Sequence, residues 1–126
     1  MDFDNSKPIY LQIVDVFYEN ILSKKWKEDE RIPSVREVAV MVEVNPNTAI
    51  RAFNHLQDQK VIYNKRGIGY FVSENGYRTV LDIKRKEFKE EMLPDVFKKM
   101  RLLDIKFEEF KNTYDEYVNN IDDEKK

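Results

Sequence analysis

The position of the glycines constrains the fold most, since all three lie within ten residues, at Gly67, Gly69 and Gly76. Flexible backbone is therefore concentrated in one short region of the 126-residue chain. On either side of Gly67 and Gly69 stand two runs of β-branched and aromatic residues, 61–63 and 70–72. This pattern predicts a two-stranded hairpin with a basic tip hinged by glycine.

Three helical segments are predicted before the hairpin. The first begins near Pro8, and apolar residues at steps of four form its buried stripe, which consists of Ile9, Ile13, Phe17 and Ile21. The second covers 34–42 and begins at Ser34 with a capping box. In this motif the serine hydroxyl accepts from the N–H of Glu37, while the Glu37 carboxylate reaches back to the N–H of Ser34.

The third helical segment, over 46–59, divides clearly into two faces. Asn45 is a good N-cap, and Pro46 suits the first turn. Apolar residues at i, i+3, i+4 and i+7 form the buried face, which consists of Ala49, Ala52, Phe53 and Leu56. The opposite, polar face carries Asn47, Arg51, Asn54 and Asp58. Three helices followed by a hairpin predict a winged helix-turn-helix, which is a mainly α fold with a small β-hairpin.

A glycine-free stretch follows the hairpin and predicts two or three more helices. We expect a long helix over 77–92, and we expect Pro94 to break or kink it. After a short joint at 104–105, a last helix places aromatic residues at steps of three and four, which is heptad-like spacing. The predicted division of the chain is a winged domain at 1–75, a helical dimerisation segment at 76–121 and a charged tail at 122–126.

The apolar residues of these last helices give more surface than one thin layer of helices can bury within a monomer. They predict a homodimer interface formed by Leu81, Phe88, Phe97, Met100, Phe107, Phe110, Tyr114 and Tyr117. A ligand-binding box is the alternative use of the aromatic stripe. It is less favoured, because two or three short helices do not easily enclose a cavity of metabolite size.

Composition excludes several classes of function. The chain has no cysteine, which excludes disulfides and thiolate metal sites, and for its single histidine, His55, only Asp58 lies within helical reach as a second ligand. The carboxylates are scattered among lysines, and no phosphate-binding glycine loop opens a helix, so we expect no enzyme, no cofactor and no metal. Without a signal peptide or an apolar run long enough for a membrane, we expect a reduced, soluble, cytoplasmic protein.

The charge distribution favours a nucleic-acid partner, although the net charge is −2. Residues 31–73 contain six Lys and Arg against three Asp and Glu, a local surplus of +3. Asn47 and Arg51 lie in the N-terminal half of the third helix, the part that usually reaches bases, and their side chains match the edges of adenine and guanine. A solvated helix face is the alternative interpretation, and the basic hairpin makes it less favoured.

Four motifs resemble the winged-helix domain of the GntR family of bacterial transcription regulators. They are P-I-Y-x-Q-I at 8–13, R-I-P-S-V-R-E-V-A at 31–39, V-N-P-N-T-A-I-R-A-F at 44–53 and G-I-G-Y-F-V at 67–72. The N-P-N-T box, followed by a few short helices, is similar to the YtrA subfamily. The resemblance implies DNA contacts by Arg36, Asn45, Asn47, Thr48, Arg51, Lys65, Arg66 and Gly69, to which the polar face of the third helix adds Asn54.

One position departs from the family pattern. Many members have an arginine where this chain has Ile50, and Arg51 follows one place later. The base sequence read by this helix is therefore not transferable from the family.

The residues and the resemblance together predict a sequence-specific transcriptional regulator. We expect a repressor that binds double-stranded DNA at an inverted-repeat operator as a homodimer, with an effector, if any, left unknown. The alternative is a winged helix that serves as a protein–protein interaction module in a larger assembly. A steep loss of DNA affinity with rising salt distinguishes the two, because only a DNA reader releases counterions on binding.

Overall fold

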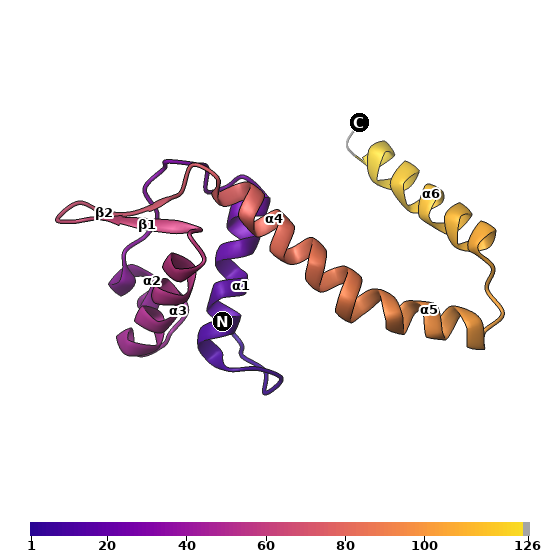
Figure 1. Cartoon of the computed structure of the whole chain (residues 1–126), viewed down its shortest axis with the longest axis horizontal. Helices are drawn as coiled ribbons and strands as arrows, with labels where there is room; N and C mark the ends of the chain where they lie inside the picture. The colour runs from indigo at the N-terminus through magenta and orange to yellow at the C-terminus, as the bar shows by residue number, and fades with distance from the viewer. Residues whose placement is uncertain (125–126) are drawn as a thin grey trace. The chain divides into compact units, whose positions relative to one another are not determined.

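The chain is organised in two compact units. The computed structural model describes residues 1–124, with one unit from Met1 to Lys84 and a second unit from Arg85 onwards. Figure 1 shows the order of the elements, from α1 at the indigo N-terminal end to α6 at the yellow C-terminal end. The division lies further along the chain than the boundary after residue 75 that the sequence suggested.

The first unit begins with three helices, α1 (Ile9–Leu22), α2 (Val35–Met41) and α3 (Pro46–Asp58). Both predicted capping signals are present. The Ser34 hydroxyl accepts from the N–H of Glu37 at 3.2 Å, and the Glu37 carboxylate accepts from the N–H of Ser34 at 3.3 Å. Asn45 Oδ1 accepts from the N–H of Asn47 at 2.8 Å. Local hydrogen bonds therefore fix where α2 and α3 begin.

The predicted hairpin, here called the wing, consists of β1 (Ile62–Lys65) and β2 (Gly69–Val72) in antiparallel pairing. The outer edge of β2 is bonded to the segment before α2, where the N–H of Ile32 donates to the carbonyl oxygen of Tyr70 at 2.9 Å. This bond ties the wing to the chain that leads into α2. The winged helix-turn-helix predicted from the sequence is confirmed (Figure 1).

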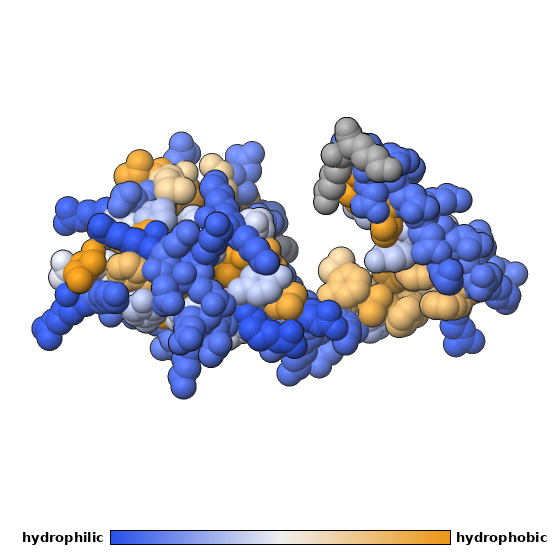
Figure 2. Space-filling model, turned by 90° about the horizontal axis from the view of Figure 1, so that it is seen from above, coloured by the Kyte–Doolittle hydropathy of each residue, from blue (hydrophilic) through white to orange (hydrophobic). Residues whose placement is uncertain are grey.

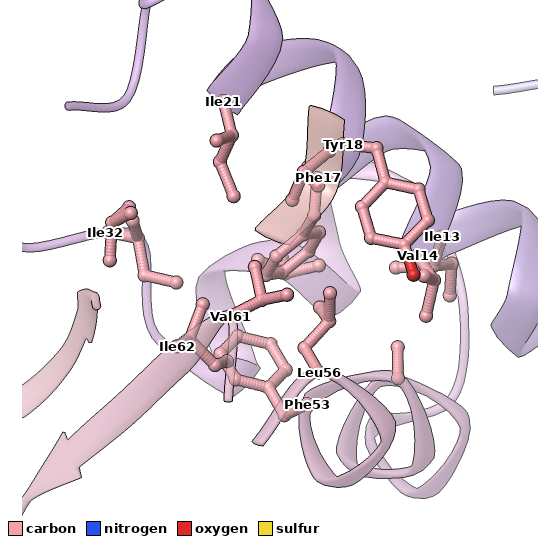
Figure 3. Close-up of a cluster of buried hydrophobic side chains, with 14 of the residues drawn as sticks. Ile13, Val14, Phe17, Tyr18, Ile21, Ile32, Phe53, Leu56, Val61 and Ile62 are labelled. Atoms are coloured by element: carbon pink, nitrogen blue, oxygen red, sulfur yellow. The ribbon is translucent and has the colours of Figure 1, made fainter. Parts of the chain in front are cut away.

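One hydrophobic core holds α1, α3 and the wing together (Figure 3). Phe17 of α1 is fully buried and meets Phe53 of α3 edge to face, with ring centroids 5.1 Å apart. It also meets the ring of Trp26 at 5.0 Å, and such edge-on contacts suit the charge distribution of aromatic rings. Further fully buried side chains surround these rings: Ile13, Val14, Ile21, Leu56, Val61, Ile62 and Val72. The core thereby fixes the rotation of α3, whose polar face points outward.

The helix that follows the wing, α4 (Gly76–Glu87), starts within this core. Val80 is fully buried there. At Gly76 the approach is close, because a Cβ atom would lie 2.9 Å from the carbonyl oxygen of Val61. The first turns of α4 therefore belong to the first unit, which explains why that unit extends to Lys84. We call residues 1–84 the winged unit.

The second unit is helical throughout its regular elements: η1 (Phe88–Met92), α5 (Leu93–Leu102) and α6 (Phe107–Glu124). The break or kink expected at Pro94 is a π-helical turn, η1, followed directly by α5. The wider turn accommodates Pro94, whose ring clashes with the carbonyl four residues earlier in a continuous α-helix. The expected joint at 104–105 separates α5 from α6.

The helices of the second unit do not form a buried core among the described residues. Among the described residues, η1, α5 and α6 contain no buried side chain. The tail expected at 122–126 is helical through Glu124, and its last two residues lie outside the described part of the chain. No helix within residues 1–124 combines the length and the apolar character that crossing a membrane requires.

Candidate nucleic-acid interface

The exposed face of α3 forms the centre of the candidate site. Asn47, Arg51 and Asn54 are exposed, whereas the opposite face of α3 is buried in the core. Thr48 is half-buried beside them, and Asn45 is exposed at the cap. The predicted polar face is therefore accessible, at the end of a helix whose free N–H groups and dipole favour a nearby anion.

Arg51 has a partner that the sequence did not indicate. Its guanidinium carbon lies 4.2 Å from the ring centroid of Tyr10 on α1, within the range of a cation–π contact. The same ring meets His55 edge-on at 6.1 Å. Tyr10 therefore restrains the guanidinium of Arg51 on the side of α3 that faces α1. The only sequence signal for this role is the position of Tyr10 in the P-I-Y motif.

Arg36 projects from α2 beside the start of α3, since Arg36 and Pro46 line one shallow cavity between the two helices. The side chain is exposed. A pairing with Glu37 or Glu43 does not form within 4.0 Å, and Glu37 is occupied by the capping box. The charge of Arg36 is therefore available to a phosphate.

The wing carries two further exposed cations, Lys65 and Arg66, at its tip. The Lys65 ammonium lies 4.8 Å from the ring centroid of Phe71. Within residues 1–124, neither cation forms an ion pair shorter than 4.0 Å, and the same is true of Arg51. Unpaired cations on α2, α3 and the wing are the arrangement that binds a phosphate backbone.

Gly69 has a structural role at the base of the wing tip. Its φ of 145° lies in a region that residues with a side chain rarely adopt, and a Cβ there would lie 2.9 Å from Nε of Arg31. The exposed Arg31 side chain therefore packs directly against the backbone of Gly69. Sequence reasoning did not assign Arg31 to the site, although Arg31 opens the R-I-P-S motif.

The base of the wing is fastened by Tyr63, whose hydroxyl donates to Asp29 Oδ1 at 3.3 Å. Partial burial of the phenol and the nearby Asp29 carboxylate both raise the pKa of Tyr63. Tyr63 therefore stays a neutral donor at physiological pH. This contact, with the bond from Ile32 to β2, sets the wing in a fixed position relative to the segment that leads into α2.

Comparison with known proteins agrees with this geometry. Residues 9–72 match the family described as "Bacterial regulatory proteins, gntR family". The chain is 34% identical over 107 residues to the uncharacterised HTH-type transcriptional regulator YhcF of Bacillus subtilis strain 168, an alignment that covers 85% of this chain and 87% of YhcF. It is 36% identical over 92 residues to the HTH-type transcriptional repressor YtrA of the same strain, which covers 73% and 71% of the two chains.

A solved structure extends the similarity beyond the winged unit. A putative GntR-family transcriptional regulator from Bacteroides thetaiotaomicron superposes with a TM-score of 0.76 and 39% identity, and the match covers 90% of this chain and 98% of that one. The resemblance predicted from the motifs is confirmed, and so is the expectation that the protein is not an enzyme. The chain belongs to the GntR family of bacterial regulatory proteins and is a DNA-binding transcriptional regulator.

Proposed function

We propose that the protein is a repressor that binds an inverted-repeat operator as a homodimer joined through its C-terminal helices. The observation that carries this proposal is the contrast between an accessible DNA-reading face on α3 and a large uncovered apolar surface on the second unit. A protein of this kind acts in the cytoplasm, where bacterial DNA is found.

On the DNA side, Asn47, Arg51 and Asn54 face the bases from α3. The free cations of Arg36, Lys65 and Arg66 face phosphates on either side of the groove. Asn45 and Thr48 complete the start of α3, and Gly69 lets the wing tip approach the backbone closely. Phosphate contacts of this type position a protein on the duplex, while base contacts supply the sequence preference.

On the dimer side, the second unit exposes bulky apolar and aromatic side chains whose exposed fractions range from 36% to 83%: Phe88, Met92, Phe97, Leu102, Leu103, Phe107, Phe110, Tyr114 and Tyr117. Figure 2 shows hydrophobic side chains at the surface of this part of the chain. Soluble monomers rarely leave contiguous apolar patches of this kind uncovered. Among the expected interface residues, Leu81 and Met100 are half-buried and the others are exposed.

A second copy of the chain is the partner that fits this surface, because a dimer would also bring two DNA-reading units to one operator. A single small module buries little surface on DNA and binds weakly. Two reading helices related by a two-fold axis enter successive major grooves when they lie about 34 Å apart, which calls for an inverted repeat. A protein fixed at such a site blocks transcription of the adjacent gene. The relative YtrA, which is 36% identical, is named as a repressor and supports this direction of control.

The test combines two measurements on the full chain. Selection from random duplexes should recover an inverted repeat, and binding to it should weaken steeply with salt. Sedimentation at micromolar concentration should give a particle of twice the chain mass of 15.2 kDa. Recovery of no preferred sequence would contradict the operator, and a stable 15.2 kDa species would contradict the dimer. Reporter expression that rises when the gene is deleted would support repression over activation.

A further inference from the structure

One residue in the polar face of α3 does not fit that face. Asn47, Ile50, Arg51 and Asn54 follow the i, i+3, i+4 and i+7 pattern and form a single stripe. All four are exposed. Ile50, which leaves 41% of its surface uncovered, is the apolar member of this stripe, and it lies between polar residues that face away from the core.

The core does not explain Ile50. It is absent from the buried cluster around Phe17 and Phe53, to which the opposite face of α3 contributes. An isoleucine also has a lower helix propensity than alanine or a long polar residue, so its presence gains nothing for α3 itself. A single exposed aliphatic side chain is ordinary elsewhere on a surface. As part of a DNA-reading stripe it faces the ligand.

The neighbours of Ile50 leave it room on its own side of the helix. On a helical projection, Asn47 and Asn54 lie near the middle of the stripe, and Ile50 and Arg51 lie on opposite sides of it. The Arg51 guanidinium is drawn toward α1 by Tyr10, at 4.2 Å from the ring centroid. A base pair on the Ile50 side is therefore met by an aliphatic group and not by a guanidinium.

We propose that Ile50 selects thymine, by packing against the 5-methyl group of that base in the major groove. The inference rests on the proposed function, namely that α3 reads an operator. Thymine is the base that presents an apolar group on the major-groove edge, and aliphatic side chains contact it there. Cytosine has only a hydrogen at the position of this methyl group, and the purines present N7 with O6 or an amino group, polar atoms that isoleucine would cover without a partner. Ile50 therefore favours thymine both by attraction and by exclusion.

The test removes the methyl group and nothing else. Once an operator has been selected with the full chain, each thymine is replaced in turn by deoxyuridine, in both half-sites together. At one position the substitution should weaken binding about fourfold for each half-site, which corresponds to about 0.8 kcal/mol for a buried methyl-sized group. The Ile50→Ala variant should bind the thymine and deoxyuridine duplexes equally at that position, and Ile50→Val should restore the preference.

Val40→Ala is the matched control, because Val40 is an exposed aliphatic residue of α2 outside the α3 stripe. It should leave every deoxyuridine effect unchanged. If the parent protein is indifferent to deoxyuridine at all positions, or if Ile50→Ala keeps the same sensitivity, the thymine assignment is wrong while the operator itself stands. If selection yields no operator at all, both this inference and the proposed function fail. Unchanged melting of Ile50→Ala shows that the fold is intact.

Discussion

The two units of this chain use apolar residues in opposite ways. In the winged unit, aliphatic and aromatic side chains from α1, α2, α3, the wing and the start of α4 form one core, and every buried residue among residues 1–124 belongs to this unit. In the unit that begins at Arg85, residues of the same types stand on η1, α5 and α6, and none of those described is buried. The two units therefore differ in whether their apolar side chains are buried, and not in whether they have such side chains.

The contrast shows why the second unit calls for a partner. Most helical stability in proteins comes from the packing of an amphipathic face, and η1, α5 and α6 have no buried side chain among those described. The aromatic stripe of α6 at Phe107, Phe110, Tyr114 and Tyr117 repeats at the spacing of helices that pack against other helices. A second copy supplies such a surface with the same chemistry.

Removal of the second unit should have the largest effect on DNA binding. A chain that ends after Lys84 should fold, sediment as a monomer and bind the selected operator at least about a thousandfold more weakly than the full chain, near its affinity for unrelated DNA. Fluorescence anisotropy with operator and scrambled duplexes measures this loss. The cut cannot be placed after Gly76, because that would remove Val80 from the core of the winged unit.

The outcome that contradicts this prediction is a truncated chain that keeps the full operator affinity. It would mean that one winged unit suffices for selective binding and that the exposed apolar surface serves another purpose. A truncated chain that fails to fold would instead place the division between the units beyond Lys84. Its melting curve separates the two cases.

Two phenylalanines, one in each unit, test the contrast in burial within the intact chain. Phe53→Ala empties the centre of the winged core and should lower the free energy of unfolding by about 3–5 kcal/mol, out of about 5–15 kcal/mol for a domain of this size. Phe107 is 71% exposed, so Phe107→Ala should change the stability of the monomer by no more than about 0.5 kcal/mol. Urea unfolding at several protein concentrations measures both.

The dependence of the stability loss on protein concentration also distinguishes the two variants. The loss from Phe53→Ala should be the same at every protein concentration, because the core lies within one chain. The loss from Phe107→Ala should grow as concentration rises, because dimerisation contributes to stability by mass action. A concentration-independent loss of several kcal/mol for Phe107→Ala would show that α6 is buried within the monomer.

Local signals account for what the sequence predicted well. The starts of α2 and α3 depend on bonds between residues two or three apart, such as Ser34 with Glu37, and the buried face of α3 depends on spacing alone. Contacts between residues far apart in the chain were not predictable. They include the ring of Tyr10 beneath Arg51, the packing of Arg31 on Gly69 and the burial of Val80. Pairwise spacing carries no information about such contacts.

A last set of variants tests whether base selection resides in the winged unit alone. Arg51→Ala should cost about 1–3 kcal/mol of operator binding per half-site and relax the preference at one base position, because a guanidinium makes paired bonds to a guanine edge. Lys65→Ala should weaken binding to all DNA sequences alike and lower the salt slope by about 1, since a phosphate contact carries no sequence information.

Tyr114→Ala, in the second unit, should weaken dimerisation and leave the order of preferred bases unchanged. Quantitative binding to a panel of single-base operator variants measures all three. A change in base preference caused by Tyr114→Ala would show that the second unit takes part in reading the DNA, and the contrast between a reading unit and a pairing unit would then fail.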